Sequence, residues 1–217
     1  SFQVWYRVGS RNELPGSTGV AHLTEHMMFK GTPAYGPGVY ARLVEQNGGQ
    51  DNAFTSHDYT SYFVNLAADK IDLILKLEAD RMQNLLLDPR AIETERKVVM
   101  EERRTRTEDD PEGFLGEELS AIAFKSHPYR WPIIGWMEDL QRITPEEVRA
   151  FYRTYYVPNN ALIVAAGDFK APDLLERIRR HFDPIPLGPA PPPVKVVEPT
   201  QQGERRVIAY EPDGVAE

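Results

Sequence analysis

GVAHLTEHMMFKGT, at residues 19–32, is the stretch around which the rest of the chain is interpreted. His22 and His26 stand four positions apart, and Glu25 precedes the second histidine. On a helix, positions i and i+4 lie on one face about a turn apart, so both imidazoles can reach one metal ion. Glu25 is rotated by about 100° from His26. It can therefore hold and deprotonate a metal-bound water without itself binding the metal.

This H-x-x-E-H arrangement is the zinc motif H-E-x-x-H read in reverse. The alternative is a surface helix with two solvated histidines and a solvated glutamate. Apolar side chains occur nearly all round the helix predicted at 19–29, which favours burial over that alternative. Because buried His and Glu need polar partners, the stretch predicts a metal site.

A catalytic zinc site needs a third protein ligand and an open position for water. The helix predicted from residue 89 to about 107 has one stripe that carries Ile92, Glu95, Val99 and Glu102. Carboxylates on an otherwise apolar face require a cation or a hydrogen-bond network. Ordinary salt bridges to Arg or Lys are the alternative for both glutamates. The spacing leaves open which of them binds the metal and which supports a ligand.

Composition excludes several classes of protein. The 217 residues include no Cys, so disulfides and thiolate metal sites are excluded. Lys and Arg number 25 against 33 Asp and Glu, and the net charge of −8 argues against nucleic acid as a partner. No apolar run approaches the ~20 residues of a membrane span. Composition therefore favours a soluble globular domain.

The order of predicted elements indicates an α+β fold with a mostly antiparallel sheet and helices packed on one face. Apolar, β-branched and aromatic runs predict strands at 2–8, 51–56, 60–67 and 161–167, the last of them a short buried strand. Periodicity and capping residues predict helices at 19–29, 38–47, 69–87, 89–107, 112–125, 145–156 and 172–181.

Three segments are expected along the chain. Residues 1–183 are interpreted as one metal-bearing domain, and 184–203 as a linker because seven Pro fall within 184–199. Residues 204–217 are expected to begin a further strand that leads to an absent second half. The chain opens inside a predicted strand without an initiator Met or a signal peptide, so we expect a fragment or a processed product.

The sequence resembles the pitrilysin/insulysin family of zinc peptidases, especially the short-chain branch with mitochondrial processing peptidase and its bacterial relatives. The resemblance is carried by GSRNE (9–13), GVAHLTEHMMFKGT (19–32), GGQDNAFTSHDYTSYF (48–63), ERKVVMEE (95–102), HPYRWPIIGW (127–136) and YYVPNNALIVAAGDF (155–169). Family members have two homologous halves that close like a clamshell around peptide, and this chain resembles the first half.

The resemblance implies a role for each residue of the predicted site. His22, His26 and Glu102 are implied as ligands of Zn²⁺, although such a set also suits other divalent ions. Glu25 is implied as the general base that activates a zinc-bound water. Glu95 is implied as a second carboxylate that orients a ligand or the water.

The implied function is a zinc metalloendopeptidase, or its catalytic half, that hydrolyses extended, unfolded peptides. The strand around Asn52, Ala53 and Phe54 is implied to bind the peptide backbone as an added strand. Further implied partners are the missing C-terminal half, a partner subunit or a homodimer mate. We expect a soluble protein of the bacterial cytoplasm or periplasm.

Two other functions are weighed against the peptidase. Scaffold or partner subunits of the family typically lose a ligand or the base, whereas this chain keeps all of them. A zinc-stabilised binding module would have no use for Glu25, and purely structural sites usually have four protein ligands. The motif therefore favours the enzyme.

Overall fold

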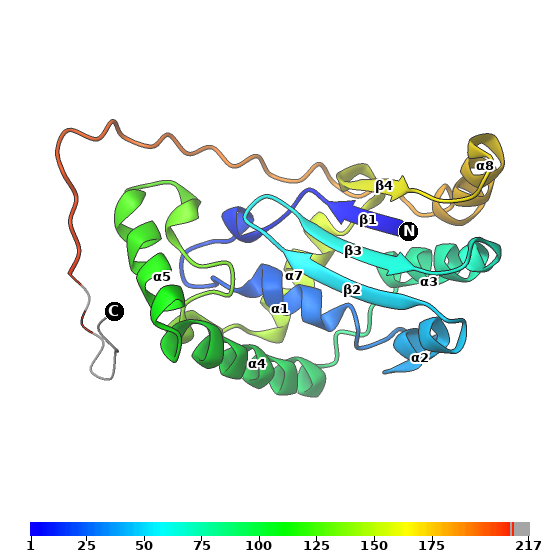
Figure 1. The fold of residues 1–217 in the computed structure, drawn as a ribbon, viewed down its shortest axis with the longest axis horizontal. Helices are drawn as coiled ribbons and strands as arrows, with labels where there is room; N and C mark the ends of the chain where they lie inside the picture. The colour runs from blue at the N-terminus through cyan, green and yellow to red at the C-terminus, as the bar shows by residue number, and fades with distance from the viewer. Residues whose placement is uncertain (209, 211–217) are drawn as a thin grey trace.

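The computed structural model describes residues 1–208 and 210 of the chain. At its centre lies a four-stranded antiparallel sheet in the order β2-β3-β1-β4 (Figure 1). The strands are β1 (Phe2–Tyr6), β2 (Gln50–Thr55), β3 (Thr60–Asn65) and β4 (Ala161–Ala165). Val4 of β1 lies opposite Tyr62 on one side and Ile163 on the other. The predicted α+β class with an antiparallel sheet is confirmed.

Eight α-helices accompany the sheet in the described part of the chain. They are α1 (Val20–Met27), α2 (Val39–Gln46), α3 (Ile71–Gln83), α4 (Pro89–Arg103), α5 (Pro111–Ala123), α6 (Met137–Leu140), α7 (Pro145–Tyr155) and α8 (Ala171–Phe182). A π-helical turn, Arg104–Glu108, follows α4 directly. None of the helices in residues 1–208 is both long and apolar enough for a membrane crossing.

Local signals explain where several helices begin. The side chain of Asp88 accepts hydrogen bonds from the backbone N–H groups of Arg90 and Ala91, with Pro89 in the first turn of α4. Thr144 and Glu147 form a capping box at the start of α7. These two helix starts agree with the sequence expectation because capping depends on residues close together in the chain.

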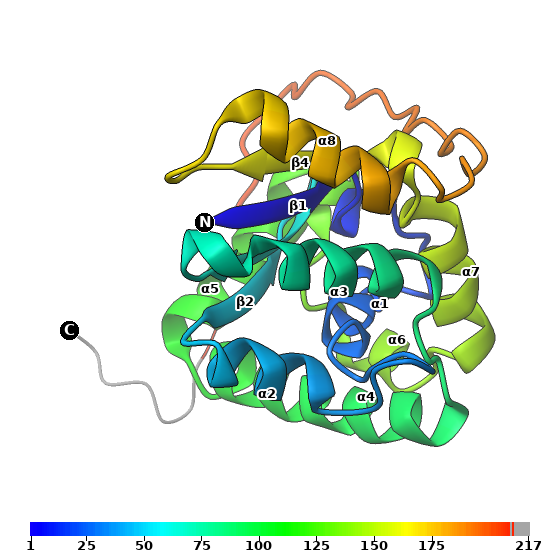
Figure 2. The same cartoon turned by 90° about the vertical axis from the view of Figure 1, so that its right-hand side faces the viewer.

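The sheet has one covered face and one more open face. Phe2, Val4 and Tyr6 of β1 point into the core and are almost fully buried. Figure 1 shows α1 and α7 behind the sheet, and Figure 2 shows the same two helices to the right of β1 and β2. Helix α3 also contacts β1. Trp5, on the opposite face, packs edge-on against Phe54 of β2 at 5.6 Å between ring centroids. The helices therefore cover the face that alternation along β1 marks as apolar.

Strand β4 corrects one expectation. The run at 161–167 is predicted to be buried, yet β4 is an edge strand whose Leu162 is 52% exposed and Val164 40% exposed. A continuous apolar run indicates burial on both faces only when both faces are covered. Here the outer face of β4 stays open. The helix predicted at 69–87 is also too long at its C-terminal end, since α3 ends at Gln83.

Residues 186–208 form neither helix nor strand and run from the end of α8 across the molecule toward α5, as the orange to red segment in Figure 1 shows. Glu198 attaches this segment to the body, since its carboxylate accepts hydrogen bonds from the backbone N–H groups of residues 125–127. The strand expected to begin within 204–217 is not formed at 205–208 or 210, and residues 209 and 211–217 lie outside the described residues.

Gly19 provides a test of the entry to α1. Its φ is +91°, and an added Cβ would lie 2.6 Å from the backbone oxygen of Ile134. We expect Gly19→Ala to lower the free energy of unfolding by about 1–3 kcal/mol, because the left-handed conformation and the close approach both disfavour a side chain. Urea unfolding of the purified chain measures the loss.

Gly116 is the matched control for this substitution. It lies inside α5 with nothing within 4 Å of an added Cβ. Gly116→Ala should raise the free energy of unfolding by about 0.5–1 kcal/mol because alanine favours the helix. A Gly19→Ala variant that unfolds at the parent's midpoint would contradict the close contact.

Candidate metal centre

Helix α1 is held at its N-terminus by Glu13. The Glu13 carboxylate accepts hydrogen bonds from the backbone N–H groups of Gly19 at 3.0 Å and Ala21 at 2.8 Å. Burial raises the pKa of Glu13 well above its usual range, although these two hydrogen bonds oppose the shift. A carboxylate at a helix N-terminus satisfies otherwise unpaired N–H groups and complements the helix dipole. No role was predicted for Glu13 from the sequence, yet it holds the start of the helix that carries both histidines.

Three side chains from two helices converge at the predicted metal site. Nε2 of His26 lies 3.3 Å from Oε2 of Glu102, and Nε2 of His22 lies 3.8 Å from the same oxygen. One donor atom from each residue lies within 4.8 Å of the other two. Tetrahedral zinc, with bonds of about 2.0–2.1 Å, holds its ligand atoms roughly 3.3 Å apart. The three residues therefore fit a zinc-sized ion after a small closing movement.

The pKa values of the two imidazoles shift in opposite directions. Burial lowers the pKa of His22, which favours the neutral form that can bind a metal. Burial alone would also lower the pKa of His26, but hydrogen bonds to Glu102 and Glu95 outweigh it and raise the pKa to about 9. A metal ion at the site would take the place of the proton on His26.

Glu95 holds His26 from the other side of the ring. Its Oε1 lies 2.9 Å from Nδ1 of His26, and its Oε2 lies 2.5 Å from Nζ of Lys30. Burial alone would raise the pKa of Glu95, but the hydrogen bonds from His26 and Lys30 outweigh it and lower the pKa. A carboxylate on the far nitrogen of a histidine fixes the ring orientation and tautomer. The two glutamates of the α4 stripe thus contact different nitrogens of one imidazole.

Glu25 lies in the same pocket as the three converging residues. The cavity has a volume of about 700 Å³ and includes His22, His26, Glu25 and Glu102 in its wall. Thr55 of β2 donates a hydrogen bond to Oε2 of Glu25. Burial raises the pKa of Glu25 although this hydrogen bond opposes the shift. A carboxylate with a raised pKa beside an open ligand position is suited to general base catalysis.

The edge strand β2 forms one wall of the cavity. Asn52, Ala53 and Phe54 all line it, and Phe54 is 39% exposed. Because β2 ends the sheet, its outer edge has no partner strand among residues 1–208. The structure therefore brings the predicted substrate strand beside the predicted metal ligands.

Two further parts of the cavity wall were not predicted from the sequence. Arg106 and Thr107 come from the π-helical turn, and residues 132–134 come from the loop before α6. Nη1 of Arg106 lies 2.7 Å from Oε1 of Glu102. The i,i+4 spacing of this ion pair is a signal that the sequence does contain. Nothing local in the sequence places the loop 132–134 at the cavity.

The other histidines lie outside the three-residue group. Nδ1 of His57 is 2.7 Å from the buried Oγ of Ser10, and its ring stacks on Tyr129 at 4.6 Å between centroids. His127 caps the short helical turn at Pro128–Arg130, and His181 lies in the last turn of α8. His57 and His127 therefore make structural contacts away from His22, His26 and Glu102.

Sequence profiles of known families match most of the chain. The family described as Insulinase (Peptidase family M16) matches residues 1–135, and the Peptidase M16 inactive domain matches 142–216. The zinc protease PqqE of Helicobacter pylori is 38% identical over 214 residues, which are 98% of this chain and 48% of that protein. A probable mitochondrial-processing peptidase subunit beta of Arabidopsis thaliana is 30% identical over 186 residues, which are 86% of this chain and 35% of that protein.

Solved structures share the fold. A protease from Helicobacter pylori superposes with a TM-score of 0.92 at 38% identity, covering 94% of this chain and 50% of that one. The first half of the periplasmic protease PqqL from Escherichia coli has a TM-score of 0.81 at 24% identity, over 92% of this chain and 44% of that one. The chain spans half or less of the length of the curated relatives it matches. The match over residues 1–135 shows that this chain belongs to the insulinase family of peptidases, family M16.

Proposed function

We propose that this chain is the metal-bearing half of a zinc metalloendopeptidase that hydrolyses extended, unfolded peptides. The observation that carries the proposal is one cavity with three parts. It holds the His22, His26 and Glu102 group, the carboxylate of Glu25, and the free edge of β2. The names of relatives as zinc proteases support zinc as the ion and peptide as the substrate.

The metal would be held by His22, His26 and Glu102, whose donor atoms already lie within 4.8 Å of one another. A bound zinc ion supplies Lewis-acid chemistry, since it polarises a carbonyl and lowers the pKa of water. Glu95 keeps Nε2 of His26 directed at Glu102 by its contact with Nδ1. Lys30 offsets the charge of Glu95, so that Glu95 remains an anion beside the ring.

Glu25 is the proposed general base. It takes a proton from the attacking water and returns that proton to the amine of the leaving peptide. Burial raises its pKa, which makes the carboxylate a better proton acceptor than a solvated one. Thr55 holds the Oε2 atom from β2, so the base and the substrate strand are joined by one hydrogen bond.

The substrate is proposed to bind as an additional strand on β2. Backbone hydrogen bonds to an edge strand recognise any extended segment and reject a folded one. Ala53 and Phe54 line the cavity, so a peptide paired with them passes the metal group. This geometry favours selection by conformation over selection by one particular side chain.

The chain corresponds to about half of its relatives, so full activity is proposed to need the second half, a partner subunit or a homodimer mate. A non-catalytic scaffold or partner subunit is the competing role. The complete set of His22, His26, Glu102 and Glu25 in one cavity supports the catalytic role.

Glu25→Gln separates metal binding from hydrolysis. The variant should keep about one zinc per chain, since Glu25 is not a proposed ligand. Its cleavage rate should fall by about 100-fold to 10,000-fold because the base is lost. Zinc is measured by atomic emission, and cleavage by a quenched fluorescent peptide with and without chelator. Glu101→Gln, an exposed residue paired with Arg104, is the control.

Cleavage by Glu25→Gln at the parent's rate would contradict the proposed role of Glu25 as the general base. If the zinc-loaded 217-residue chain is inactive, the same variants are compared in the full-length protein. If the full-length protein shows no chelator-sensitive cleavage either, the result would favour the non-catalytic scaffold or partner role.

Glu102→Gln and Glu95→Gln test the two carboxylates against each other. Glu95→Gln should weaken zinc binding by about 10-fold to 100-fold, the usual effect of losing a group that orients a ligand. Glu102→Gln should weaken it more, since an anionic carboxylate ligand is replaced by a neutral amide. Competition with a chromophoric zinc chelator gives both dissociation constants. A larger loss for Glu95→Gln would show that the two roles are exchanged.

A further inference from the structure

Among the described residues that line the metal cavity, Arg106 is the one Lys or Arg side chain. Its side chain is 73% exposed, although its Nη1 contacts Oε1 of Glu102 at 2.7 Å. A guanidinium has five N–H donors in a planar fork, and this single ion pair leaves most of them facing the cavity and solvent. Arg106 is therefore able to bind a second acceptor while it contacts Glu102.

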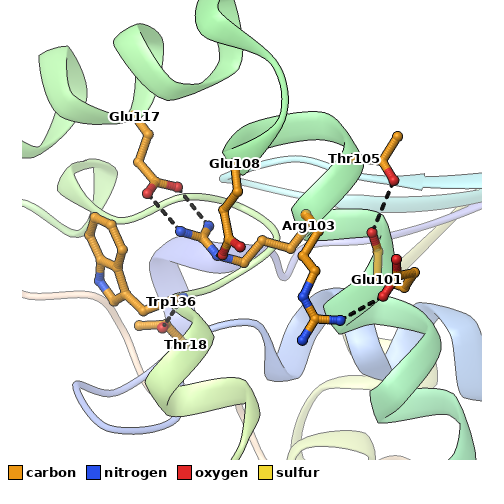
Figure 3. Close-up of polar contacts among 8 residues, drawn as sticks. Thr18, Glu101, Arg103, Thr105, Glu108, Glu117 and Trp136 are labelled. Atoms are coloured by element: carbon orange, nitrogen blue, oxygen red, sulfur yellow. Dashed lines mark hydrogen bonds and ion pairs between the residues drawn. The ribbon is translucent and has the colours of Figure 1, made fainter. Parts of the chain in front are cut away.

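Arg103, which lies directly before the turn that carries Arg106, connects this part of the chain to α5. Arg103 is buried, and its two terminal nitrogens each lie 2.7 Å from an oxygen of Glu117 on α5 (Figure 3). Its guanidinium carbon also lies 5.8 Å from the centroid of the Trp136 ring. A bidentate Arg–carboxylate pair fixes geometry more strongly than a single hydrogen bond does. Arg103 thus joins the end of α4 to α5.

The neighbouring side chains of the turn are occupied elsewhere. Arg104 pairs with Glu101 at 2.6 Å. Thr105 donates a hydrogen bond to the backbone oxygen of Glu101 (Figure 3). π-helical turns are rare and are frequently found at functional sites. Here the turn places Arg106 and Thr107 in the cavity wall.

The rest of the cavity explains what Arg106 would recognise. Glu25 and Glu102 contribute two carboxylates, and Ile133, Ile134 and Phe54 contribute apolar surface. Carboxylates repel an acidic group of an incoming peptide, and apolar walls do not compensate its charge. A guanidinium binds a carboxylate through two parallel hydrogen bonds and is less strongly hydrated than an ammonium. Among the described wall residues, Arg106 is the one Lys or Arg that could pair with an acidic group of a peptide.

We infer that Arg106 is a specificity-determining residue that binds a carboxylate of the peptide close to the scissile bond. The carboxylate comes either from an Asp or Glu side chain or from the peptide's own C-terminus, since both present the same acceptor pair. This inference rests on the proposed function of the cavity. It is tested by binding as well as by cleavage, so that the two fail separately.

The experiment uses the zinc-loaded 217-residue chain with Glu25→Gln, so that bound peptides stay intact. End-blocked fluorescent peptides of one sequence carry Asp, Asn or Lys at each position in turn, and a matched set has a free C-terminus. Anisotropy titration gives each dissociation constant. At one position Asp should bind about tenfold more tightly than Asn, the effect of one charge-assisted contact. A preference found only with the free C-terminus assigns the carboxylate to that source.

Variants of Arg106 decide the assignment. Adding Arg106→Gln should abolish the preference for the carboxylate, and adding Arg106→Glu should turn it toward Lys. Arg104→Gln is the matched control, because it removes a neighbouring arginine that pairs outside the cavity, and it should keep the preference. Zinc dissociation constants are measured for every variant to detect an effect through Glu102.

Two results would overturn the inference. Equal binding of the Asp, Asn and free C-terminal peptides, or no binding of any peptide, would show that Arg106 selects nothing. An Arg106→Gln variant that loses zinc and weakens all peptides equally would show that Arg106 only holds Glu102. Chelator-sensitive cleavage of neutral peptides by the parent chain would then leave the proposed peptidase function intact.

Discussion

His26 forms the contact on which the site depends, because it joins two helices that lie far apart in the sequence. Its Nδ1 contacts Glu95 and its Nε2 faces Glu102, both on α4, whereas His26 itself belongs to α1. Buried charged groups are tolerated only when each one has a partner. The contacts that hold α1 against α4 are therefore the same contacts that orient the proposed metal ligands. Glu13 adds to it by fixing the other end of α1.

The same rule of paired buried charges recurs beneath the sheet. Glu78 and Arg81 of α3 are both almost fully buried and form an ion pair at 2.6 Å. The guanidinium of Arg81 lies over the rings of Tyr40 and Tyr62, and the Tyr40 hydroxyl donates a hydrogen bond to Glu78. This cluster joins α2, α3 and β3. It supports the sheet whose edge strand β2 forms one cavity wall. Arg103 and Glu117 join α4 to α5 next to the turn that carries Arg106.

Local patterns predicted the parts of the fold that short stretches determine. The helix starts after Asp88 and Thr144 and the apolar, β-branched first strand each depend on a few adjacent residues, and all are present. Burial of β4 was predicted wrongly, because an apolar run does not reveal whether its outer face is covered. The π-helical turn after α4 was missed as well. Next to this turn, Arg103 pairs with Glu117, fourteen residues away, and such a contact has no local sequence pattern.

The sequence by itself determined that His22, Glu25 and His26 lie close together on one helix, since helical periodicity makes positions three and four apart neighbours. It also placed Glu95 and Glu102 on one stripe of a second helix. That spacing did not distinguish which carboxylate would bind the metal and which would support a ligand. Only the tertiary structure decided that Glu102 faces Nε2 of both histidines while Glu95 meets Nδ1 of His26. It also brought Arg106 and β2 to the same cavity. The physical reason is that these contacts depend on how whole helices and strands pack, and no local periodicity encodes that packing.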